Sequence, residues 1–415
     1  MLYREIKKCR ICGNPDLKNI INLGNLALTG LFPRENETVE SGPLELVKCK
    51  DNGSGKHCGL LQLRHNYDLN VLYGDNYGYR SGLNKSMVNH LNLIVKKIKK
   101  IVAPKKNDLI IDIGSNDSTL LQAFQNHDLQ LVGIDPTAKK FKQFYPPHIE
   151  YISKFFSAQI VHKKLNRKAK VITTIAMFYD LEEPIRFMQE IYDVLAEDGI
   201  WVLEQSYMPM MFDNISYDTI CHEHLEYYTL KQIKWMADVV GFKIIDVEFN
   251  DINGASFCLT LAKNNSKYTK KTKQINKILS QEKKNGLDTL GIYRDFEKRV
   301  KNHREQLIKF IKKVRQKGKT IFGYGASTKG NVILQYCNIT AKDIPYIAEI
   351  NEYKFNRYTP GTRIPIISEK EAKSLNPDYF MVLPWHFKEN IINREKKYLG
   401  SGGHLFFPLP KFEII

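Results

Sequence analysis

Long apolar runs are missing from this sequence. No stretch approaches the roughly 18 to 20 consecutive apolar residues that a helix needs to cross a bilayer, although 43% of the residues are hydrophobic. The opening residues, MLYREIKKCRICGN, also lack the apolar core of a signal peptide. We therefore expect a globular, cytoplasmic protein with no membrane partner.

Cysteine is scarce and unevenly placed, which argues against a disulfide framework. Of the 7 cysteines, four fall within the first 58 residues, and these are Cys9, Cys12, Cys49 and Cys58. Four thiolates match the tetrahedral, soft-ligand preference of structural zinc. The spacing C-x2-C of the first pair is typical of such sites, whereas the second pair is wider. His57 is an alternative fourth ligand, and buried free thiols are the alternative to any metal.

Acidic residues are outnumbered, with 62 Lys and Arg against 45 Asp and Glu and a formal net charge of +17. Such an excess raises the possibility of nucleic acid or an anionic ligand. The lysines are dispersed, however, for example over 96–100 and 268–316. This dispersion favours a solvated surface and disfavours nucleic acid. A zinc-containing nucleic-acid-binding protein with salt-sensitive binding remains the alternative from another functional class.

The length of 415 residues predicts two or three domains. Residues 1–66 carry the cysteines between turn-forming residues and short apolar runs, and we interpret them as a small zinc-binding module. Within 67–263, a tyrosine-rich loop leads into a helical pattern over 87–98, and short β-rich runs then alternate with helical patterns. The runs lie at 109–113, 131–134, 171–175, 200–204 and 257–262.

The rest of the chain repeats an α/β pattern after a polar segment. Residues 264–317 have apolar residues at helical spacing and are expected to form a helical linker. Residues 318–415 contain strand-like runs at 320–322, 346–350, 379–383 and 404–408. The predicted fold class is therefore α/β: a small zinc-binding module, a central Rossmann-like domain of the class I methyltransferase type and a carboxy-terminal Rossmann-like domain.

A dinucleotide-binding GxGxxG turn is also missing where one is expected. The first central run ends instead in Asp112-Ile-Gly114-Ser-Asn116-Asp117, and the next run ends in Asp135-Pro136. The glycine allows a ligand to approach the backbone, and Asp135 is placed to accept hydrogen bonds from ribose hydroxyls. This pattern favours S-adenosylmethionine over a nicotinamide dinucleotide. We expect Asp112, Gly114, Asn116, Asp117, Asp135 and Pro136 to bind it.

Histidine, carboxylate and tyrosine gather in the segment 217–228, which contains His222-Glu223-His224 and Tyr227-Tyr228. Such a cluster can remove a proton from an acidic carbon. The spacing is not the HExxH of helical zinc proteases, which disfavours a second metal site. A structural role for the histidines is the alternative. Further along, Gly323-Tyr-Gly325 opens a turn that either binds phosphate or sugar or only permits close packing.

Taken together, the chain resembles the deoxysugar C-methyltransferases, which methylate a carbon of a nucleotide-linked 4-keto sugar. The resemblance covers nearly the whole chain. It rests on the amino-terminal cysteines, on Tyr77-x-Tyr79-x-Ser-Gly, on the turn 112–117, on the segment 223–228, and on the turn 323–330. It implies a zinc module, a methyl-donor domain and a carboxy-terminal domain that helps to hold the nucleotide sugar.

By the same resemblance, His224 is expected to take the proton from sugar C3, with Glu223 beside it and Tyr77 near the keto oxygen. The residues expected to contact the substrate are Tyr79, Tyr179, His222, Tyr227, Gly325 and Lys329. The family often has a histidine where this chain reads Tyr179. Either Tyr179 takes over its polar role or a different sugar is accommodated.

Two further expectations complete the hypothesis. The alternative reaction is O- or N-methylation of a sugar or another small acceptor, for which no keto group is needed. The chain is expected to be a monomer or a weak oligomer.

Overall fold

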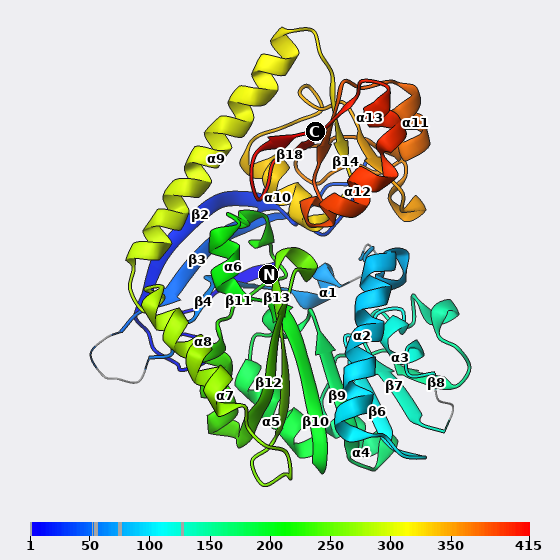
Figure 1. The fold of residues 1–415 in the computed structure, drawn as a ribbon. Coiled ribbons are helices and arrows are strands. Elements are labelled where there is room, and N and C mark those ends of the chain that lie inside the picture. Colours follow the sequence, from blue (N-terminus) through cyan, green and yellow to red (C-terminus); the bar gives the residue numbers. More distant parts are fainter. Residues whose placement is uncertain (1, 52, 54–56, 74–76, 126–127) are drawn as a thin grey trace.

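The computed structural model describes residues 2–51, 53, 57–73, 77–125 and 128–415. Residues 74–76 of the predicted tyrosine loop lie outside the described residues. Sheets of seven, six and four strands organise the protein, and a two-stranded sheet pairs β1 (Tyr3–Glu5) with β5 (His65–Tyr67) (Figure 1). Among the helices that can be described, none is both long and apolar enough for a membrane span.

The seven-stranded sheet has the order β12-β13-β10-β9-β6-β7-β8. Strands β6 to β10 are parallel, while β13 runs antiparallel to β10 and β12. Its members are β6 (Leu109–Ile113), β7 (Gln130–Ile134), β8 (Ile149–Ile152), β9 (Ala169–Ile175), β10 (Leu195–Ser206), β12 (Phe242–Asn250) and β13 (Ser256–Lys263). All five runs predicted for this region lie within these strands, which confirms the central Rossmann-like architecture.

Helices cover both faces of this sheet. Successive side chains of a strand point to opposite faces, and the strands carry apolar side chains on both. Ile110 packs with α2 (Lys85–Val102) and α3 (Thr119–Gln122), whereas Ile111 packs on the opposite face. The helices there are α4 (Ala158–Leu165), α5 (Pro184–Val194) and α7 (Leu230–Val240). The sheet is therefore buried on both faces, and its carboxy-terminal edge carries the loops of the site.

The four-stranded sheet has the order β11-β4-β3-β2. It consists of β2 (Leu17–Ala27), β3 (Ser41–Cys49), β4 (Leu61–Leu63) and β11 (Glu226–Tyr227). Strand β2 was not predicted, because two register shifts against β3 break its alternation of buried and exposed residues. Strand β11 comes from the segment 217–228, so the amino-terminal module shares a sheet with the central part of the chain.

The six-stranded sheet has the order β16-β15-β14-β17-β18-β19, and only its last pair is antiparallel. Its strands are β14 (Ile321–Tyr324), β15 (Ile347–Glu349), β16 (Ile366–Ser368), β17 (Tyr379–Val382), β18 (His404–Phe407) and β19 (Glu413–Ile414). The helices beside it are α10 (Thr328–Tyr336), α11 (Glu369–Ser374), α12 (Lys388–Arg394) and α13 (Lys396–Gly400). The four predicted runs coincide with β14, β15, β17 and β18.

The predicted helical linker consists of two helices, α8 (Thr272–Lys284) and α9 (Gly291–Gln316). Helix α8 ends just before Gly286, whose φ of 76° lies in the left-handed region and interrupts the helical path. Helix α9 runs beside β2 along one edge of the molecule (Figure 1). Short helices α1 (Leu69–Leu72) and α6 (Met208–Asp213) complete the set. Residues of β2, α9 and the six-stranded sheet share one hydrophobic core.

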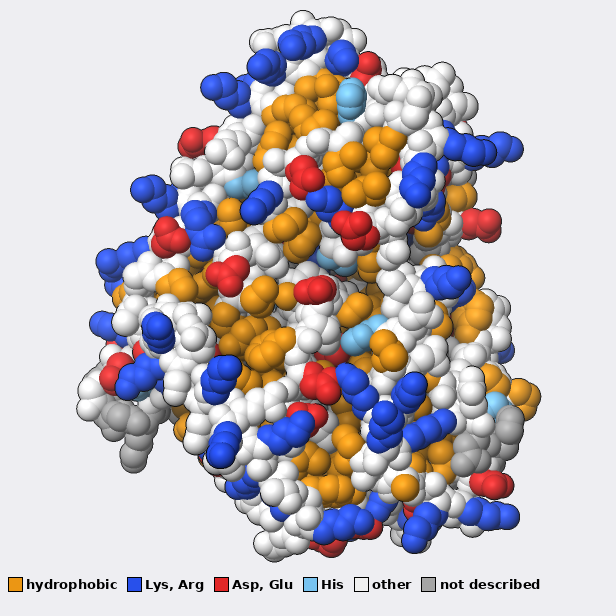
Figure 2. Space-filling model, viewed as in Figure 1, with side chains coloured by type: hydrophobic (Ala, Val, Ile, Leu, Met, Phe, Trp, Pro, Cys, Tyr) orange, Lys and Arg blue, Asp and Glu red, His pale blue; other side chains and the backbone are white. Residues whose placement is uncertain are grey.

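Basic side chains are scattered over the face of the molecule seen in Figure 2. They alternate with acidic and apolar side chains and do not gather in one patch on that face. This matches the solvated lysine-rich surface predicted from the dispersion of the charges.

Candidate active site

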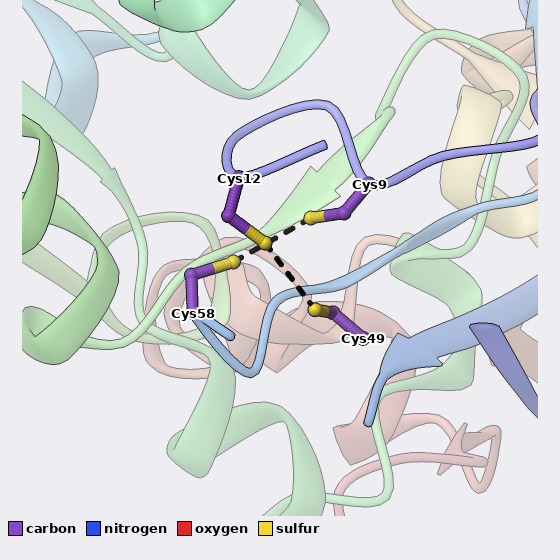
Figure 3. A group of neighbouring side chains, drawn as sticks. All are labelled: Cys9, Cys12, Cys49 and Cys58. Carbon is purple, nitrogen blue, oxygen red and sulfur yellow. Dashed lines mark hydrogen bonds between the residues drawn. The ribbon is translucent and has the colours of Figure 1, made fainter. Parts of the chain in front are cut away.

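The four amino-terminal cysteines converge on one point (Figure 3). The sulfur atoms of Cys9, Cys12, Cys49 and Cys58 all lie within 4.8 Å of one another. Two of the separations are 3.5 Å, and a tetrahedral zinc site with Zn–S bonds of about 2.3 Å needs sulfurs about 3.8 Å apart. The donor set therefore fits zinc. His57 is not in the cluster and contacts Asp51 instead, at 3.2 Å.

The glycine turn after β6 brings two predicted cofactor residues together. Gly114 has a φ of 75°, and a Cβ there would lie 3.1 Å from Cγ of Met177, so the backbone passes close to that side chain. The amide of Asn116 donates to Oδ2 of Asp135 at 2.8 Å, across the ends of β6 and β7. The amide and hydroxyl of Thr137 donate to Oδ1. Asp135 is thus held at the carboxy-terminal edge of the sheet, followed by Pro136.

Asp112 lies within β6, just before this edge of the sheet, and is buried. The hydroxyl of Thr173 donates to its Oδ1 at 2.6 Å. Burial raises the pKa of Asp112 from 3.8 to about 7, and the Thr173 hydrogen bond opposes the shift. The carboxyl group is therefore poised between its neutral and charged forms near neutral pH.

The described end of the tyrosine loop, residues 77–83, is fastened to the same turn. The side-chain amide of Asn116 donates to the carbonyl of Tyr79 and accepts from the amide of Ser81. The amide of Gly82 donates to Oδ2 of Asp117 at 2.9 Å. The side chains of Asn116 and Asp117 therefore hold the loop, a role that the sequence analysis did not assign to them.

The same loop also reaches the carboxy-terminal sheet. The side-chain amide of Asn351, which follows β15, donates to the carbonyl of Gly78 at 3.3 Å. Lys140 of the central domain donates to the carbonyl of Tyr77 at 2.6 Å. The loop therefore joins the two α/β parts, and Tyr77 and Tyr79 lie where those parts meet.

His224 is held in one tautomer. Its Nδ1 lies 2.9 Å from the carbonyl oxygen of Thr219, and because a carbonyl only accepts, Nδ1 carries the proton. Nε2 then has a free lone pair and makes no hydrogen bond within the described part of the chain. Burial, reinforced by the charge of Lys329, lowers the pKa of His224 to about 3. The ring is neutral at physiological pH.

Tyr179 packs directly on this ring, with centroids 4.3 Å apart. It follows β9 in the 3₁₀ turn Phe178–Asp180, and its carbonyl accepts from the amide of Leu225 at 2.8 Å. Its hydroxyl makes no hydrogen bond among the described residues. Tyr179 and His224 therefore come from two adjoining loops and face each other.

Two buried carboxyl groups lie beside this pair. Burial raises the pKa of both Glu223 and Asp180, and the charge of Glu223 adds to the shift of Asp180. Oε2 of Glu223 and Oδ1 of Asp180 have no hydrogen-bond partner among the described residues, while Tyr73 donates to Oδ2 of Asp180 at 2.7 Å. Both carboxyl groups therefore hold a proton more strongly than an exposed carboxyl group does. Burial together with the charge of Asp135 also raises the pKa of Tyr77.

Lys329 reaches the site from the carboxy-terminal part. It lies in the first turn of α10, and its Nζ donates to the carbonyl of Asn253 at 2.7 Å. Its charge contributes to the lowered pKa of both His224 and His386. Gly325 lies before α10, directly after β14, and a Cβ on it would fall 2.7 Å from Pro384. Gly325 is therefore required for close packing, and Lys329 is the side chain of this turn that joins the cluster.

Two predicted substrate residues are engaged by the protein itself. His222 is fully buried, and its Nδ1 accepts from the amide of Thr29 while its Nε2 donates to the carbonyl of Gly42. The hydroxyl of Tyr227 donates to the carbonyl of Thr219 at 3.3 Å. His222 thus has no free ring nitrogen in this arrangement.

Several residues of the cluster were not predicted. Thr219 sets the tautomer of His224, and Gly30 leaves the space that Oε1 of Glu223 occupies. Asp218 accepts from Trp385 at 2.8 Å and so joins the central and carboxy-terminal parts. Thr219 and Asp218 lie in the segment 217–228 that the sequence analysis selected, so their position was a signal. Gly30 gave none, because its partner lies far away in the sequence.

Comparison with known proteins divides the chain into three matched regions. Residues 9–73 match a family model described as "Putative zinc binding domain", and residues 88–247 match one described as "Methyltransferase domain". Residues 251–410 match one described as "C-methyltransferase C-terminal domain". In this order, the three matched regions correspond to a C-methyltransferase with an amino-terminal zinc-binding domain.

A curated relative of this C-methyltransferase is C-methyltransferase NovU of Streptomyces niveus. The two are 27% identical over 419 residues, which cover 100% of this chain and 98% of that protein. The enzyme is accordingly an S-adenosylmethionine-dependent methyltransferase with a structural zinc site, as the resemblance had implied.

Similar solved structures are more distant. The plantazolicin methyltransferase BamL, in complex with a triazolic desmethylPZN analog and SAH, is 13% identical, with a TM-score of 0.36, covering 44% of this chain and 87% of that one. The complex of the Haloferax volcanii Trm112 methyltransferase activator with a methyltransferase is 10% identical, with a TM-score of 0.37, covering 47% and 97%.

Proposed function

We propose that this C-methyltransferase methylates C3 of a nucleotide-linked 4-keto-6-deoxy sugar, with His224 as the base that removes the C3 proton. The observation that carries the proposal is the tautomer of His224, whose Nδ1 donates to Thr219 while Nε2 makes no hydrogen bond within the described residues. A neutral imidazole with a free lone pair, packed against Tyr179, is what proton removal requires.

A 4-keto group acidifies the adjacent C–H, and removal of that proton gives an enolate. The depressed pKa keeps His224 unprotonated before the reaction but also makes it a weak base. Negative charge that develops on the enolate raises the proton affinity of the neighbouring imidazole. The base is therefore strengthened as the proton is transferred.

The keto oxygen needs hydrogen-bond donors as its charge grows. Tyr77 is one candidate, because its raised pKa keeps the phenol protonated. Glu223 is the second, because burial raises its pKa and Oε2 has no hydrogen-bond partner among the described residues. A buried, protonated carboxylic acid can donate a hydrogen bond to an enolate oxygen. The ammonium group of Lys329 adds positive charge to the same surroundings.

The methyl donor would be held at the carboxy-terminal edge of β6 and β7, by Asp112, Gly114, Asn116, Asp117, Asp135 and Pro136. Gly114 supports this assignment, because its left-handed backbone and its missing Cβ let the chain turn closely. When bound, S-adenosylmethionine supplies the electrophilic methyl group that the enolate carbon takes.

Each of the predicted domains is assigned one role in the reaction. Residues 1–66 would form the zinc module, 67–263 the methyl-transfer domain, 264–317 the helical connection and 318–415 the part that holds the nucleotide. Substrate contacts are proposed for Tyr79, Tyr179, Tyr227 and Lys329, with Gly325 shaping the turn before Lys329. His222 is left out of this set, because the backbone occupies both of its ring nitrogens.

The test is product analysis by mass spectrometry and NMR, after incubation of the protein with S-adenosylmethionine and a panel of nucleotide-linked 4-keto-6-deoxy sugars. We expect the gain of one methyl group bonded to C3. A 4-keto group also acidifies C5, so a methyl group on C5 would contradict the proposed position but not C-methylation. A methyl group on oxygen or nitrogen, or S-adenosylmethionine binding without any product, would reject sugar C-methylation.

A further inference from the structure

The side chain of Arg10 occupies the turn between the first two metal-binding cysteines, Cys9 and Cys12. Its guanidinium group is buried rather than exposed, with only 2% of the side chain accessible. A buried guanidinium is costly unless its donors are used. Its partners therefore show what the cysteine turn is built to hold.

Most of those partners lie in β4 and β5, two short strands that only Arg64 separates. Nη1 donates to the carbonyl of Leu63 at 2.6 Å, and Nη2 donates to the carbonyl of His65 at 3.2 Å. Nε donates to the side chain of Asn66 at 3.0 Å. Gln62 accepts from both the backbone amide and Nη1 of Arg10. The forked guanidinium thus fixes the end of β4 relative to the cysteine turn.

The end of β4 in turn holds the segment that carries His224. The amide of Leu63 donates to the carbonyl of Leu225 at 2.8 Å, and Nη1 of Arg10 lies 3.5 Å from that same carbonyl. Next along the chain, β11 pairs with β4, and the carboxylate of Glu226 faces Nε of Arg10 at 3.7 Å. On its other side, Leu225 donates to the carbonyl of Tyr179.

A second link starts from another metal ligand. The side-chain amide of Gln232, in the first turn of α7, donates to the carbonyl of Cys58 at 2.9 Å. The cysteine turns therefore contact the chain within the segment 224–228, at Leu225 and Glu226, and again beyond it, at Gln232. The imidazole of His224 is hydrogen-bonded to Thr219 in its own loop. The next residue, Leu225, is held by Leu63 and Arg10 of the amino-terminal module.

We infer that the zinc-binding turn positions the catalytic histidine through Arg10, and that the amino-terminal module is part of the active site rather than an accessory. Arg10 is a positioning residue: it acts through Leu63 and Leu225 on His224. The inference rests on the proposed function only in taking His224 as the base. The methyl-donor site stands on the central sheet and does not depend on Arg10.

Hydrogen exchange of the full chain, with zinc bound and after its removal by a chelator, tests the coupling without any substrate. We expect peptides that cover 219–228 to lose protection together with the cysteine turn, while peptides that cover 109–117 keep theirs. If the segment 219–228 keeps its protection when zinc is removed, the inference is wrong. This outcome is independent of what the enzyme methylates.

Arg10→Met separates the arginine from the metal. We expect full zinc content and an unchanged affinity for S-adenosylmethionine, with kcat lowered about a hundredfold, the size of effect that a displaced catalytic group produces. The ring signal of His224 in histidine-labelled protein should shift or broaden. Arg10→Lys keeps the charge but not the fork, so we expect a smaller loss of kcat.

Arg64→Met is the matched control, because Arg64 lies in the same module and pairs with Glu5 and Glu45 but not with Leu225. We expect it to leave the His224 signal and kcat unchanged. Arg10→Met protein with full zinc content and an unaltered His224 signal would overturn the inference. If Arg10→Met does not fold, the comparison of Arg10→Lys with Arg64→Met and the exchange experiment decide the matter. Failure of the sugar substrates alone would affect only the proposed function.

Discussion

The ring of Tyr179 lies against the imidazole of His224, with centroids 4.3 Å apart and planes inclined by 59°. The two residues come from loops after neighbouring strands of the central sheet, β9 and β10. Their backbones are also joined, since Leu225 donates to the carbonyl of Tyr179. This ring contact restricts the orientation of the His224 imidazole and keeps the side chain of Tyr179 beside it.

Tyr179→Phe tests the hydroxyl while it retains the ring contact. The hydroxyl has no partner among the described residues, so we expect thermal stability and affinity for S-adenosylmethionine to stay unchanged. If the hydroxyl bonds the sugar, kcat/KM for the acceptor should fall by about two- to tenfold, the value of one neutral hydrogen bond. Steady-state kinetics with the active sugar measures it. An unchanged kcat/KM would mean that the tyrosine serves only to pack the histidine.

His224→Gln removes the base and keeps a polar side chain of similar size. We expect kcat to fall by about 10² to 10⁴, the range for loss of a general base. Binding of S-adenosylmethionine, followed by calorimetry, should not change. His162→Gln is the control, because the side chain of His162 is exposed and pairs with Asp193 on the surface. Product formation at the rate of the unmodified enzyme would remove His224 from the mechanism.

The sequence predicted the central sheet well because its strands are short, apolar runs bounded by turns. Strand β6 matches its predicted bounds, and the turn that follows it contains three of the residues selected for the cofactor, Gly114, Asn116 and Asp117. The four cysteines were also identified correctly as a metal-binding group, since four thiolates close together in a sequence are typical of a structural zinc site. These features are local, so the sequence alone carries the signal.

The relations between distant segments were not predictable in this way. Strand β11 joins a sheet whose other strands lie more than 150 residues earlier, and two residues give no periodicity to detect. The engagement of both nitrogens of His222 by Thr29 and Gly42 depends on that same packing. So does the role of Asn116, which holds the backbone of Tyr79 and Ser81. Side-chain roles of this kind are set by tertiary contacts, which leave no local pattern in the sequence.

Removal of zinc should destabilise the amino-terminal module and its packing on the central domain, because Cys9, Cys49 and Cys58 lie in the core that also contains residues of α5 and α7. We expect Cys58→Ser to lower the zinc content and the melting temperature, since structural zinc contributes directly to folding free energy. Elemental analysis and calorimetry measure both. Cys337→Ala is the control, a buried thiol outside the cluster. Equal zinc content in the two variants would contradict a four-cysteine site.

Asp112→Asn should change the pH dependence of stability. The pKa of Asp112 is about 7 in the folded protein, against 3.8 for an ordinary aspartate. The folded state therefore holds a proton that the unfolded state releases, so Asp112 lowers stability progressively as the pH rises from about 4 to about 7, by roughly 1.4 kcal/mol per pH unit at most. Asparagine cannot ionise, so the variant should gain stability relative to the unmodified protein between about pH 5 and about pH 7.

Urea unfolding at these two pH values measures the difference. Asp108→Asn is the control, since Asp108 lies just before β6 and is only partly buried. A stability difference between Asp112→Asn and the unmodified protein that is the same at both pH values would show that Asp112 titrates normally.

Lys329→Met should raise the pKa of His224. The ammonium group disfavours the protonated imidazole, and it contributes to the pKa of about 3. Without it, His224 gains its proton at higher pH, so the acidic limb of kcat/KM moves toward neutral pH. An NMR titration of the histidine ring measures the shift directly. Lys354→Met is the control, a partly buried lysine of the same domain that faces Glu349 and donates to the carbonyl of Ala326. A pKa of His224 that stays constant in Lys329→Met would show that the lysine is too far away to act on the imidazole.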